Sequence, residues 1–127
     1  MKVEISNGEL LDKLSILEIK KAKIVDPIKL KNIDTELVIL ANLSINLLSN
    51  KEVAKIFDEL CKVNLKLWEI EDNLRNKELH HQFDGEFLDF ARSVYFTNDE
   101  RSELKRAINN LTESTIIEEK SYTKYRL

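Results

Sequence analysis

The sequence predicts an all-α protein, a four-helix-bundle-like single domain over residues 1–127 with the last helix broken near Thr97-Asn98. Only two Gly and one Pro occur in 127 residues, which disfavours the many tight turns of a β-sandwich or barrel. Apolar residues recur at helical spacing over long stretches. The composition of 43% hydrophobic and 34% charged residues is typical of a folded protein with a charged surface. A chain of this length builds one core, so we expect one domain.

The first two helices are delimited by local signals. Ser6 and Glu9 have the spacing of a capping box, so a helix begins there. It ends at Asp26-Pro27, because the residue before Pro avoids the α region and Pro suits the first turn of the next helix. The second helix extends to about Ser49. Since the connection is very short, we expect these two helices to pack as an antiparallel hairpin.

A long third helix is predicted from Asn50, a good N-cap, to Glu78. At 1.5 Å per residue it would span about 40 Å, which exceeds the size of a compact bundle of this length. Its last turns therefore either project into a partner subunit or fray near Asn76. We favour the first alternative and expect a homodimer.

The remaining chain is predicted as a broken helix and a tail. Asp84 caps a helix that ends at Thr97, where a second capping box with Glu100 begins another helical segment. Residues 113–127 show no clear period. We expect either an extended tail that packs through Ile116, Ile117 and Tyr122, or disorder beyond Ser121.

Charge and composition exclude several classes of function. The net charge of −3 and the pI of about 5.5 argue against a nucleic-acid binder, which is usually strongly basic. The N-terminus lacks the apolar core of a signal peptide, and no window approaches the ~20 apolar residues of a membrane span. We therefore expect a cytoplasmic protein without a membrane partner. The single cysteine, Cys61, excludes an internal disulfide.

The best candidate site lies where the apolar face of the third helix turns polar. Asn64, Glu71 and Arg75 share that face, and a buried charge must be paired or open to a ligand. Two interpretations stay open: Glu71 and Arg75 neutralise each other as an i,i+4 pair, or the face lines a ligand pocket. The other residues that we expect to line it are Trp68, Arg92, Tyr95, Asn98, Asp99, Arg101 and Lys105.

A pocket of this kind would suit an anionic small molecule. Arg side chains bind phosphate or carboxylate through two parallel hydrogen bonds, and Lys adds a point charge. Glu69 and Asp72 could hold Mg²⁺ that bridges phosphates, while Trp68 and Tyr95 could flank a base or sugar. The first hypothesis is thus a binding or accessory module for a nucleotide or sugar nucleotide.

Two alternatives belong to other classes. The pairs Glu9-x-x-Asp12 and Glu69-x-x-Asp72 each place two carboxylates one turn apart, as in a Mg²⁺ cage for pyrophosphate hydrolysis. In outline this resembles the all-α nucleotide pyrophosphohydrolases, although their Glu-x-x-Glu pair is missing and Glu9 is explained as a cap. The third hypothesis is a structural oligomerisation module. Whether the protein is an enzyme stays open, because no catalytic triad, Gly-rich phosphate loop or cysteine nucleophile is found.

Four stretches carry a family resemblance: ISNGELLDKLSILEIKKAKI, LWEIEDNLR, ARSVYFTNDERSELKRAIN and IEEKSY. Through them the chain resembles a family of small uncharacterised bacterial and phage proteins. The resemblance implies a compact helical domain, and an association of some relatives with glycosyltransferase-containing proteins or gene neighbourhoods. It supplies no catalytic residue. It draws attention to Trp68, Glu71, Asp72, Arg75, Arg92, Tyr95, Asn98, Asp99, Arg101, Lys105 and Lys120.

Overall fold

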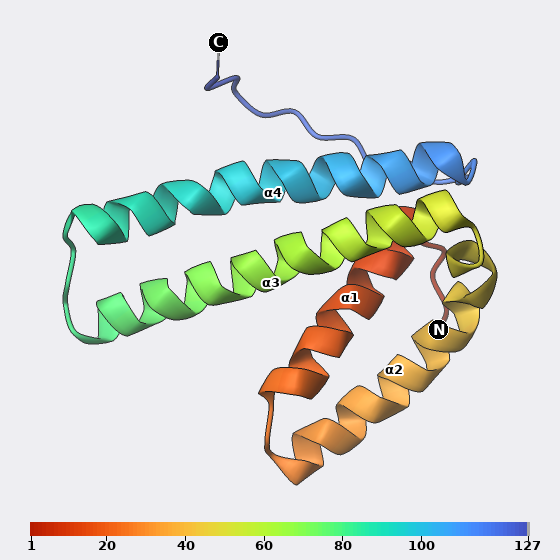
Figure 1. Cartoon of the computed structure of the whole chain (residues 1–127), viewed down its shortest axis with the longest axis horizontal. Helices are drawn as coiled ribbons and strands as arrows, with labels where there is room; N and C mark the ends of the chain where they lie inside the picture. The colour runs from red at the N-terminus through yellow and green to blue at the C-terminus, as the bar shows by residue number, and fades with distance from the viewer. Residues whose placement is uncertain (127) are drawn as a thin grey trace.

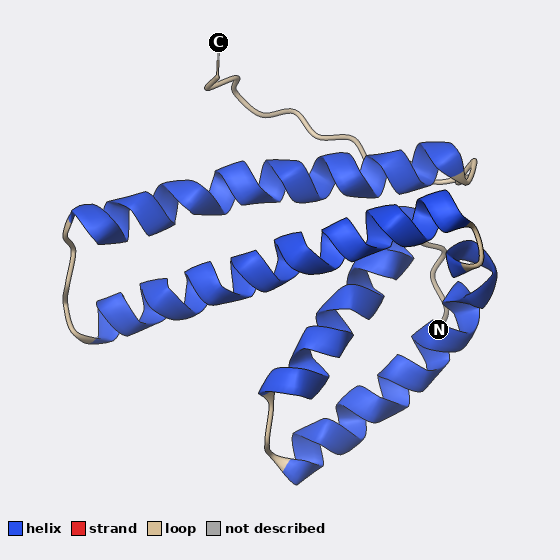
Figure 2. Cartoon of the chain, viewed as in Figure 1, coloured by secondary structure: helices blue, strands red, loops and turns tan. Residues whose placement is uncertain are grey.

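A computed structural model describes residues 1–126 and contains four α-helices. They are α1 (Asn7–Lys23), α2 (Pro27–Leu48), α3 (Lys51–Leu79) and α4 (Gly85–Leu111). No strand occurs in these 126 residues, and Figure 2 shows helices joined by short loops, with an irregular segment at each end. The prediction of an all-α domain of four packed helices is confirmed.

Local capping sets where each helix begins. A side-chain oxygen of the residue before each helix accepts a hydrogen bond from a backbone N–H of the first turn, at 2.9–3.0 Å. Such a bond satisfies one of the donors that a helix N-terminus leaves unpaired. The four caps are Ser6, Asp26, Asn50 and Asp84.

The predicted break near Thr97-Asn98 is wrong, because α4 is continuous from Gly85 to Leu111. Thr97 is only 1% exposed, and its hydroxyl has no hydrogen-bond partner among the described residues. Thr97, Leu104 and Ile108 lie on one helical stripe that packs toward the other helices. Because this stripe is buried, α4 continues through Thr97. In an exposed segment the same residues would begin a new helix.

The four helices form two antiparallel hairpins (Figure 1). The predicted α1–α2 hairpin is confirmed, and α3 and α4 lie side by side over their length. The last turns of α3 do not fray near Asn76: they continue to Leu79 beside the start of α4. In the described part of the chain, α1 contacts the other three helices, whereas α2 contacts α1 and α3 but not α4. Helix α3 also contacts the other three, so α1 and α3 together form the centre of the domain.

The apolar core lies where the two hairpins meet. Its buried residues come from α1, α3 and α4, and half-buried leucines of α2, among them Leu37 and Leu40, cover it from one side. Burial of each such side chain contributes about 1.5–3 kcal/mol. The core residues are Leu11, Leu14, Val53, Phe57, Leu60 and Ile108.

A close backbone approach joins the start of α1 to the end of α4. The Gly8 N–H donates to Asn109 Oδ1 at 2.7 Å, and Asn7 Nδ2 donates to Thr112 Oγ1 at 2.9 Å. A Cβ atom on Gly8 would lie 2.4 Å from the carbonyl oxygen of Lys105. Glycine is therefore required for this contact.

We expect Gly8→Ala to lower the free energy of unfolding by about 2–3 kcal/mol, because α1 must move away from the α4 backbone and strain the buried bond to Asn109. Urea denaturation followed by circular dichroism measures this. Gly85→Ala is the matched control: nothing lies within 4 Å of its added Cβ, so stability should be unchanged or rise by up to about 1 kcal/mol. Equal effects of both substitutions would contradict the proposed role of the contact.

Candidate functional site

Asp12 of α1 and Arg101 of α4 form a buried ion pair at the centre of a cluster of polar side chains. Asp12 is only 1% exposed. Arg101 Nε donates to Asp12 Oδ1 at 2.9 Å, and Arg101 Nη2 donates to Oδ2 at 2.5 Å. Two parallel bonds of this kind fix both the distance and the orientation of the two groups. Arg101 is therefore engaged within the protein through two of its three nitrogens.

Asn64 of α3 completes this cluster. Its Nδ2 donates to Asp12 Oδ1 at 2.8 Å and to Ser15 Oγ at 2.6 Å, and Ser15 Oγ donates to the Asp12 carbonyl at 2.7 Å. Burial raises the pKa of Asp12, but bonds from Arg101 and Asn64, with the charges of Arg101 and Lys105, outweigh it and lower that pKa. Asp12 is thus a stable carboxylate that links three helices.

Lys105 repeats the pairing one turn along α4. Its Nζ lies 2.6 Å from Glu9 Oε2 and 3.7 Å from Asp12 Oδ2. Lys13, whose side chain is 47% exposed, adds a third cation 3.8 Å from Glu9 Oε1. Arg101 and Lys105, which the sequence assigned to an anionic ligand, are thus paired with Asp12 and Glu9.

A small hollow of about 220 Å³ adjoins the ion pair and brings five predicted residues together. Glu71 and Arg75 do form the expected i,i+4 pair, at 3.6 Å, but their side chains are 53% and 78% exposed. The pair is therefore not sealed in the core; Glu71 lines the hollow together with Arg101, whereas Arg75 does not. The hollow is lined by Ile16, Ile19, Asn64, Leu67, Trp68, Glu71, Asn98 and Arg101.

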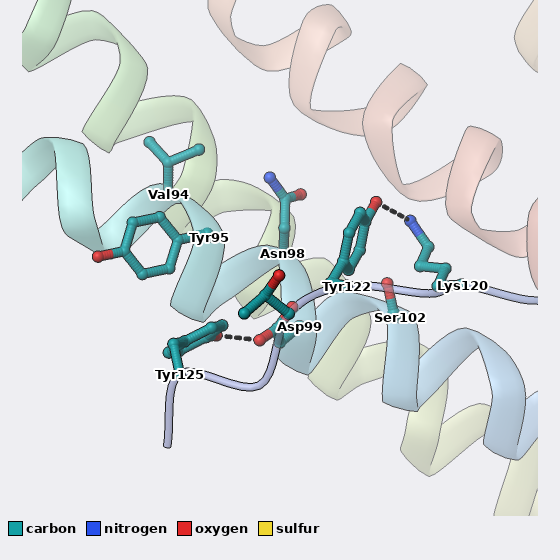
Figure 3. Close-up of a pocket in the computed structure, with 9 residues that line it drawn as sticks. Val94, Tyr95, Asn98, Asp99, Ser102, Lys120, Tyr122 and Tyr125 are labelled. Carbon is teal, nitrogen blue, oxygen red and sulfur yellow. Dashed lines mark hydrogen bonds between the residues drawn. The ribbon is translucent and has the colours of Figure 1, made fainter.

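A larger groove of about 600 Å³ lies between α4 and the C-terminal segment (Figure 3). Three tyrosines, a lysine and several hydroxyl and amide groups surround it. Figure 3 shows Tyr95 and Asn98 on α4, with Tyr122 and Tyr125 brought in by the segment that passes across the helix. The lining residues are Val94, Tyr95, Asn98, Asp99, Ser102, Lys120, Tyr122, Thr123 and Tyr125.

Polar contacts hold the beginning of the C-terminal segment. Ser6 Oγ donates to Glu118 Oε2 at 2.8 Å, and Asn109 Nδ2 donates to Glu118 Oε1 at 3.3 Å. Arg106 makes two bonds to Glu119, at 2.9 and 3.1 Å. Of the two expectations for the tail, the extended one describes residues 113–126; Leu127 lies outside the described residues.

Aromatic contacts hold the end of the segment. Tyr125 donates a hydrogen bond to Asp99 Oδ2, and its ring packs edge-on against Tyr95 at 5.0 Å between centroids. Arg126 lies 4.2 Å above the Phe96 ring. The anchors are thus Glu118, Glu119, Tyr125 and Arg126, whereas the expected Ile116, Ile117 and Tyr122 remain exposed.

Lys120 is the cation most available to a ligand of the groove. Its Nζ lies 3.5 Å from the Tyr122 hydroxyl, and it makes no ion pair within residues 1–126. It also borders an adjoining hollow of about 200 Å³, together with Lys105 and Arg106. Glu103, Glu118 and Glu119 line that hollow as well, so its cations and carboxylates are equal in number.

The structure separates the residues that the sequence assigned to one pocket. Asn64, Trp68, Glu71, Asn98 and Arg101 border the small hollow, while Tyr95, Asn98 and Asp99 border the groove. Lys105 lines the adjoining hollow. Arg75 and Arg92 line none of these hollows, although Arg92 lies 5.8 Å from the centre of the Phe96 ring.

The predicted carboxylate cage is not assembled. Glu69 and Asp72 are exposed on α3, and Glu9 and Asp12 are engaged by Lys105 and Arg101. Within residues 1–126, no three His, Cys, Asp or Glu side chains converge as metal ligands. The geometry therefore offers no arrangement like the two facing carboxylate pairs of the pyrophosphohydrolase hypothesis.

Cys61 is unsuited to nucleophilic chemistry. Burial, with the nearby charges of Glu18 and Asp58, raises the pKa of its thiol to about 11. A thiol that stays protonated at neutral pH is a poor nucleophile. The cysteine is partly buried and packs against the margin of the core.

Comparison with protein families gives one match, a family of unknown function (DUF6165), over residues 1–125. The chain belongs to DUF6165. The match spans nearly the whole domain, so the ion pair, the groove and the anchored segment up to Tyr125 lie within the family region. No curated protein and no solved structure matches the chain. Among the described helices of this family member, none is long and apolar enough to cross a membrane.

The key residues that sequence reasoning missed are Asp12 and the aromatic residues of the tail. Asp12 was considered only as a metal ligand, yet Gly8, Asp12, Ser15 and Ile19 are spaced by four, three and four residues and are all buried. This second stripe on α1 was the available signal. Tyr122 was expected only as a packing residue of the tail, and Tyr125 had no signal, because the segment that carries them has no periodic pattern.

We expect Asp12→Asn to lower the free energy of unfolding by about 2–3 kcal/mol. The substitution keeps the shape but leaves Arg101 without its carboxylate, and the 29% exposure of Arg101 moderates the cost. Chemical denaturation measures the change. Asp72→Asn, at an exposed position of α3, should change stability by less than about 0.5 kcal/mol.

We also expect the free energy of unfolding to fall in acid, in part because Asp12 becomes protonated. A folded-state pKa below the unfolded value of about 3.9 stabilises the fold above that pH, and the contribution disappears as the pH falls through the folded-state pKa. The pKa of Glu118 is also lowered: burial raises it, but bonds from Ser6 and Asn109 and the charge of Lys105 outweigh that effect. Thermal melts from pH 7 to pH 2 should show a smaller decrease in Asp12→Asn than in the natural chain.

Proposed function

We propose that the protein is a small binding module that holds an anionic small molecule, a nucleotide or sugar nucleotide, in the groove between α4 and residues 118–126. The observation that carries this proposal is the groove itself. Its volume of about 600 Å³ falls in the range of about 300–1,000 Å³ that is usual for small-molecule sites. The small hollow beside Arg101, at about 220 Å³, is below that range.

The lining of the groove suits a ring system. Tyr95, Tyr122 and Tyr125 border it from two sides, and tyrosine faces stack on bases and sugars while their hydroxyls remain available for hydrogen bonds. Asn98, Ser102 and Thr123 add amide and hydroxyl groups. A few such polar groups among aromatic surface fix the orientation of a ligand.

One cation of the lining, Lys120, suits a phosphate at one end of the groove. Lys120 borders both the groove and the adjoining hollow. The cations first expected to bind the anion, Arg101 and Lys105, are already paired with carboxylates. A phosphate beside Lys120 would gain a charge-assisted bond without displacing an existing ion pair.

We expect binding to depend on Tyr122 and Lys120. Isothermal titration with nucleoside di- and triphosphates and with UDP-glucose identifies the best ligand, and Tyr122→Ala and Lys120→Ala should each weaken its binding at least tenfold. A stacked base is worth about 1–3 kcal/mol, and tenfold corresponds to about 1.4 kcal/mol. Lys124→Ala is the matched control, because Lys124 lies on the same segment but does not line the groove.

Two outcomes would reject this proposal. One is the absence of binding by every compound in the panel, with and without Mg²⁺. The other is binding that Trp68→Leu abolishes and Tyr122→Ala leaves intact, which would place the ligand in the small hollow. Phosphate release from a nucleoside triphosphate that is lost in Glu69→Gln and Asp72→Asn variants would instead support the pyrophosphohydrolase hypothesis.

A further inference from the structure

Residues 115–126, the last part of the described chain, lie against the rest of the protein without a backbone–backbone hydrogen bond. The final bond of this kind runs from the Ser114 N–H to the Asn109 carbonyl, at 2.9 Å. Every residue from 115 to 126 is exposed, and Figure 1 shows the segment turning back from the end of α4 without regular structure. A segment with few buried contacts and no such bonds opens at a much lower free energy than the helices need to unfold.

Glu118 fixes the beginning of this segment. Its carboxylate accepts hydrogen bonds from Ser6 Oγ at 2.8 Å and from Asn109 Nδ2 at 3.3 Å, and both donor residues are at most 2% exposed. Asn109 also binds the Gly8 N–H, so one side chain holds both α1 and the segment. Release of Glu118 would leave two buried donors unpaired, which is costly. We name these two bonds the Glu118 anchor.

Contacts at the protein surface fix the other end of the segment. Tyr125 donates a hydrogen bond to Asp99, and its ring centroid lies 5.0 Å from that of Tyr95 and 5.3 Å from that of Phe96. Arg126 covers the Phe96 ring at 4.2 Å. Tyr125 and Tyr95 are each 43% exposed, so water can replace these contacts at little cost. We name this set of contacts the Tyr125 anchor, and it is the weaker of the two.

The residues of the segment that line the groove all follow the Glu118 anchor. They are Lys120, Tyr122, Thr123 and Tyr125, and Figure 3 shows the segment that carries them crossing α4, which forms the opposite wall. Next to the Glu118 anchor, Glu119 is paired with Arg106 of α4. We infer that residues 120–126 form a lid over the groove, which opens when the Tyr125 anchor releases while the Glu118 anchor holds. The four helices stay folded as the lid opens.

The lid controls access for the proposed ligand, and this step rests on the proposed function. A ligand that contacts both walls is enclosed only when the lid is closed. It therefore favours the closed state and leaves when the lid opens. Arg126 holds the lid through the Phe96 ring but does not line the groove. Removal of its side chain thus changes the rate of ligand exchange without removing a group that touches the ligand.

Nitrogen-15 relaxation dispersion on the ligand-free protein tests the lid. The amides of residues 120–126 should exchange between two states on the microsecond-to-millisecond timescale, and the amide of Glu118 should not. Tyr125→Phe removes the hydrogen bond to Asp99, so it should raise the open population about two- to tenfold. Arg126→Ala, which removes the contact with Phe96, should raise it as well.

Two variants on the same segment are matched controls and should leave the open population unchanged. Tyr122→Phe removes a hydroxyl whose hydrogen bond, from Lys120, lies within the segment. Lys124→Ala removes a cation that makes no ion pair within residues 1–126. Neither change touches the Tyr125 anchor or the Glu118 anchor.

Several results would overturn the lid. They are residues 120–126 as rigid as α4 or disordered in the natural chain, release of Glu118 together with Tyr125, and an open population that Tyr125→Phe leaves unchanged. Where UDP-glucose binds, Arg126→Ala should speed its dissociation and Lys124→Ala should not, and equal rates would overturn control of access by the lid. Failure of every nucleotide to bind counts against the proposed function alone, because the relaxation measurement needs no ligand.

Discussion

The bonded pair of Asp12 and Arg101 is the constraint on which the arrangement of the helices depends. A carboxylate that is 1% exposed must have partners, and removal from water without them costs several kcal/mol. The pair fixes α1 against α4, and Asn64 adds α3 to the same carboxylate. The Glu9–Lys105 pair and the Gly8–Asn109 contact join the same two helices. Across these three contacts the residue numbers rise along α1 as they fall along α4, as antiparallel packing requires. Another register would leave a buried charge unpaired, so the polar cluster selects one arrangement among the many that apolar packing allows.

Helix boundaries could be predicted because the interactions that set them are local. Each N-cap bond joins residues two or three positions apart, so the sequence contains both partners within one turn. The same reasoning failed at Thr97, where the spacing to Glu100 is that of a capping box. There the outcome depends on α3 and α1, which bury the stripe containing Thr97 and Ile108. Tertiary burial outweighs a cap worth about 1 kcal/mol.

The candidate site was predicted in part for the same reason. Helical phase on α3 correctly indicated that Asn64 faces inward, since phase is a property of one helix. It could not identify Asp12 as its partner, because that pairing requires the register of α1 against α3. The positions of the Tyr122 and Tyr125 side chains could not be predicted in this way. Their positions depend on the bond between Ser6 and Glu118, which are 112 positions apart, and on the bond between Arg106 of α4 and Glu119 of the tail. No local sequence period predicts such contacts.

The groove and the Asp12 cluster share α4, which limits how a ligand could alter the fold. The groove is formed by α4 and the C-terminal segment, and Arg101 and Lys105 of the same helix are paired with Asp12 and Glu9 of α1. Helix α4 also packs along α3. Paired, charge-assisted bonds of this kind resist small displacements of the helix. A fixed α4 would leave that wall of the groove formed before the proposed ligand binds.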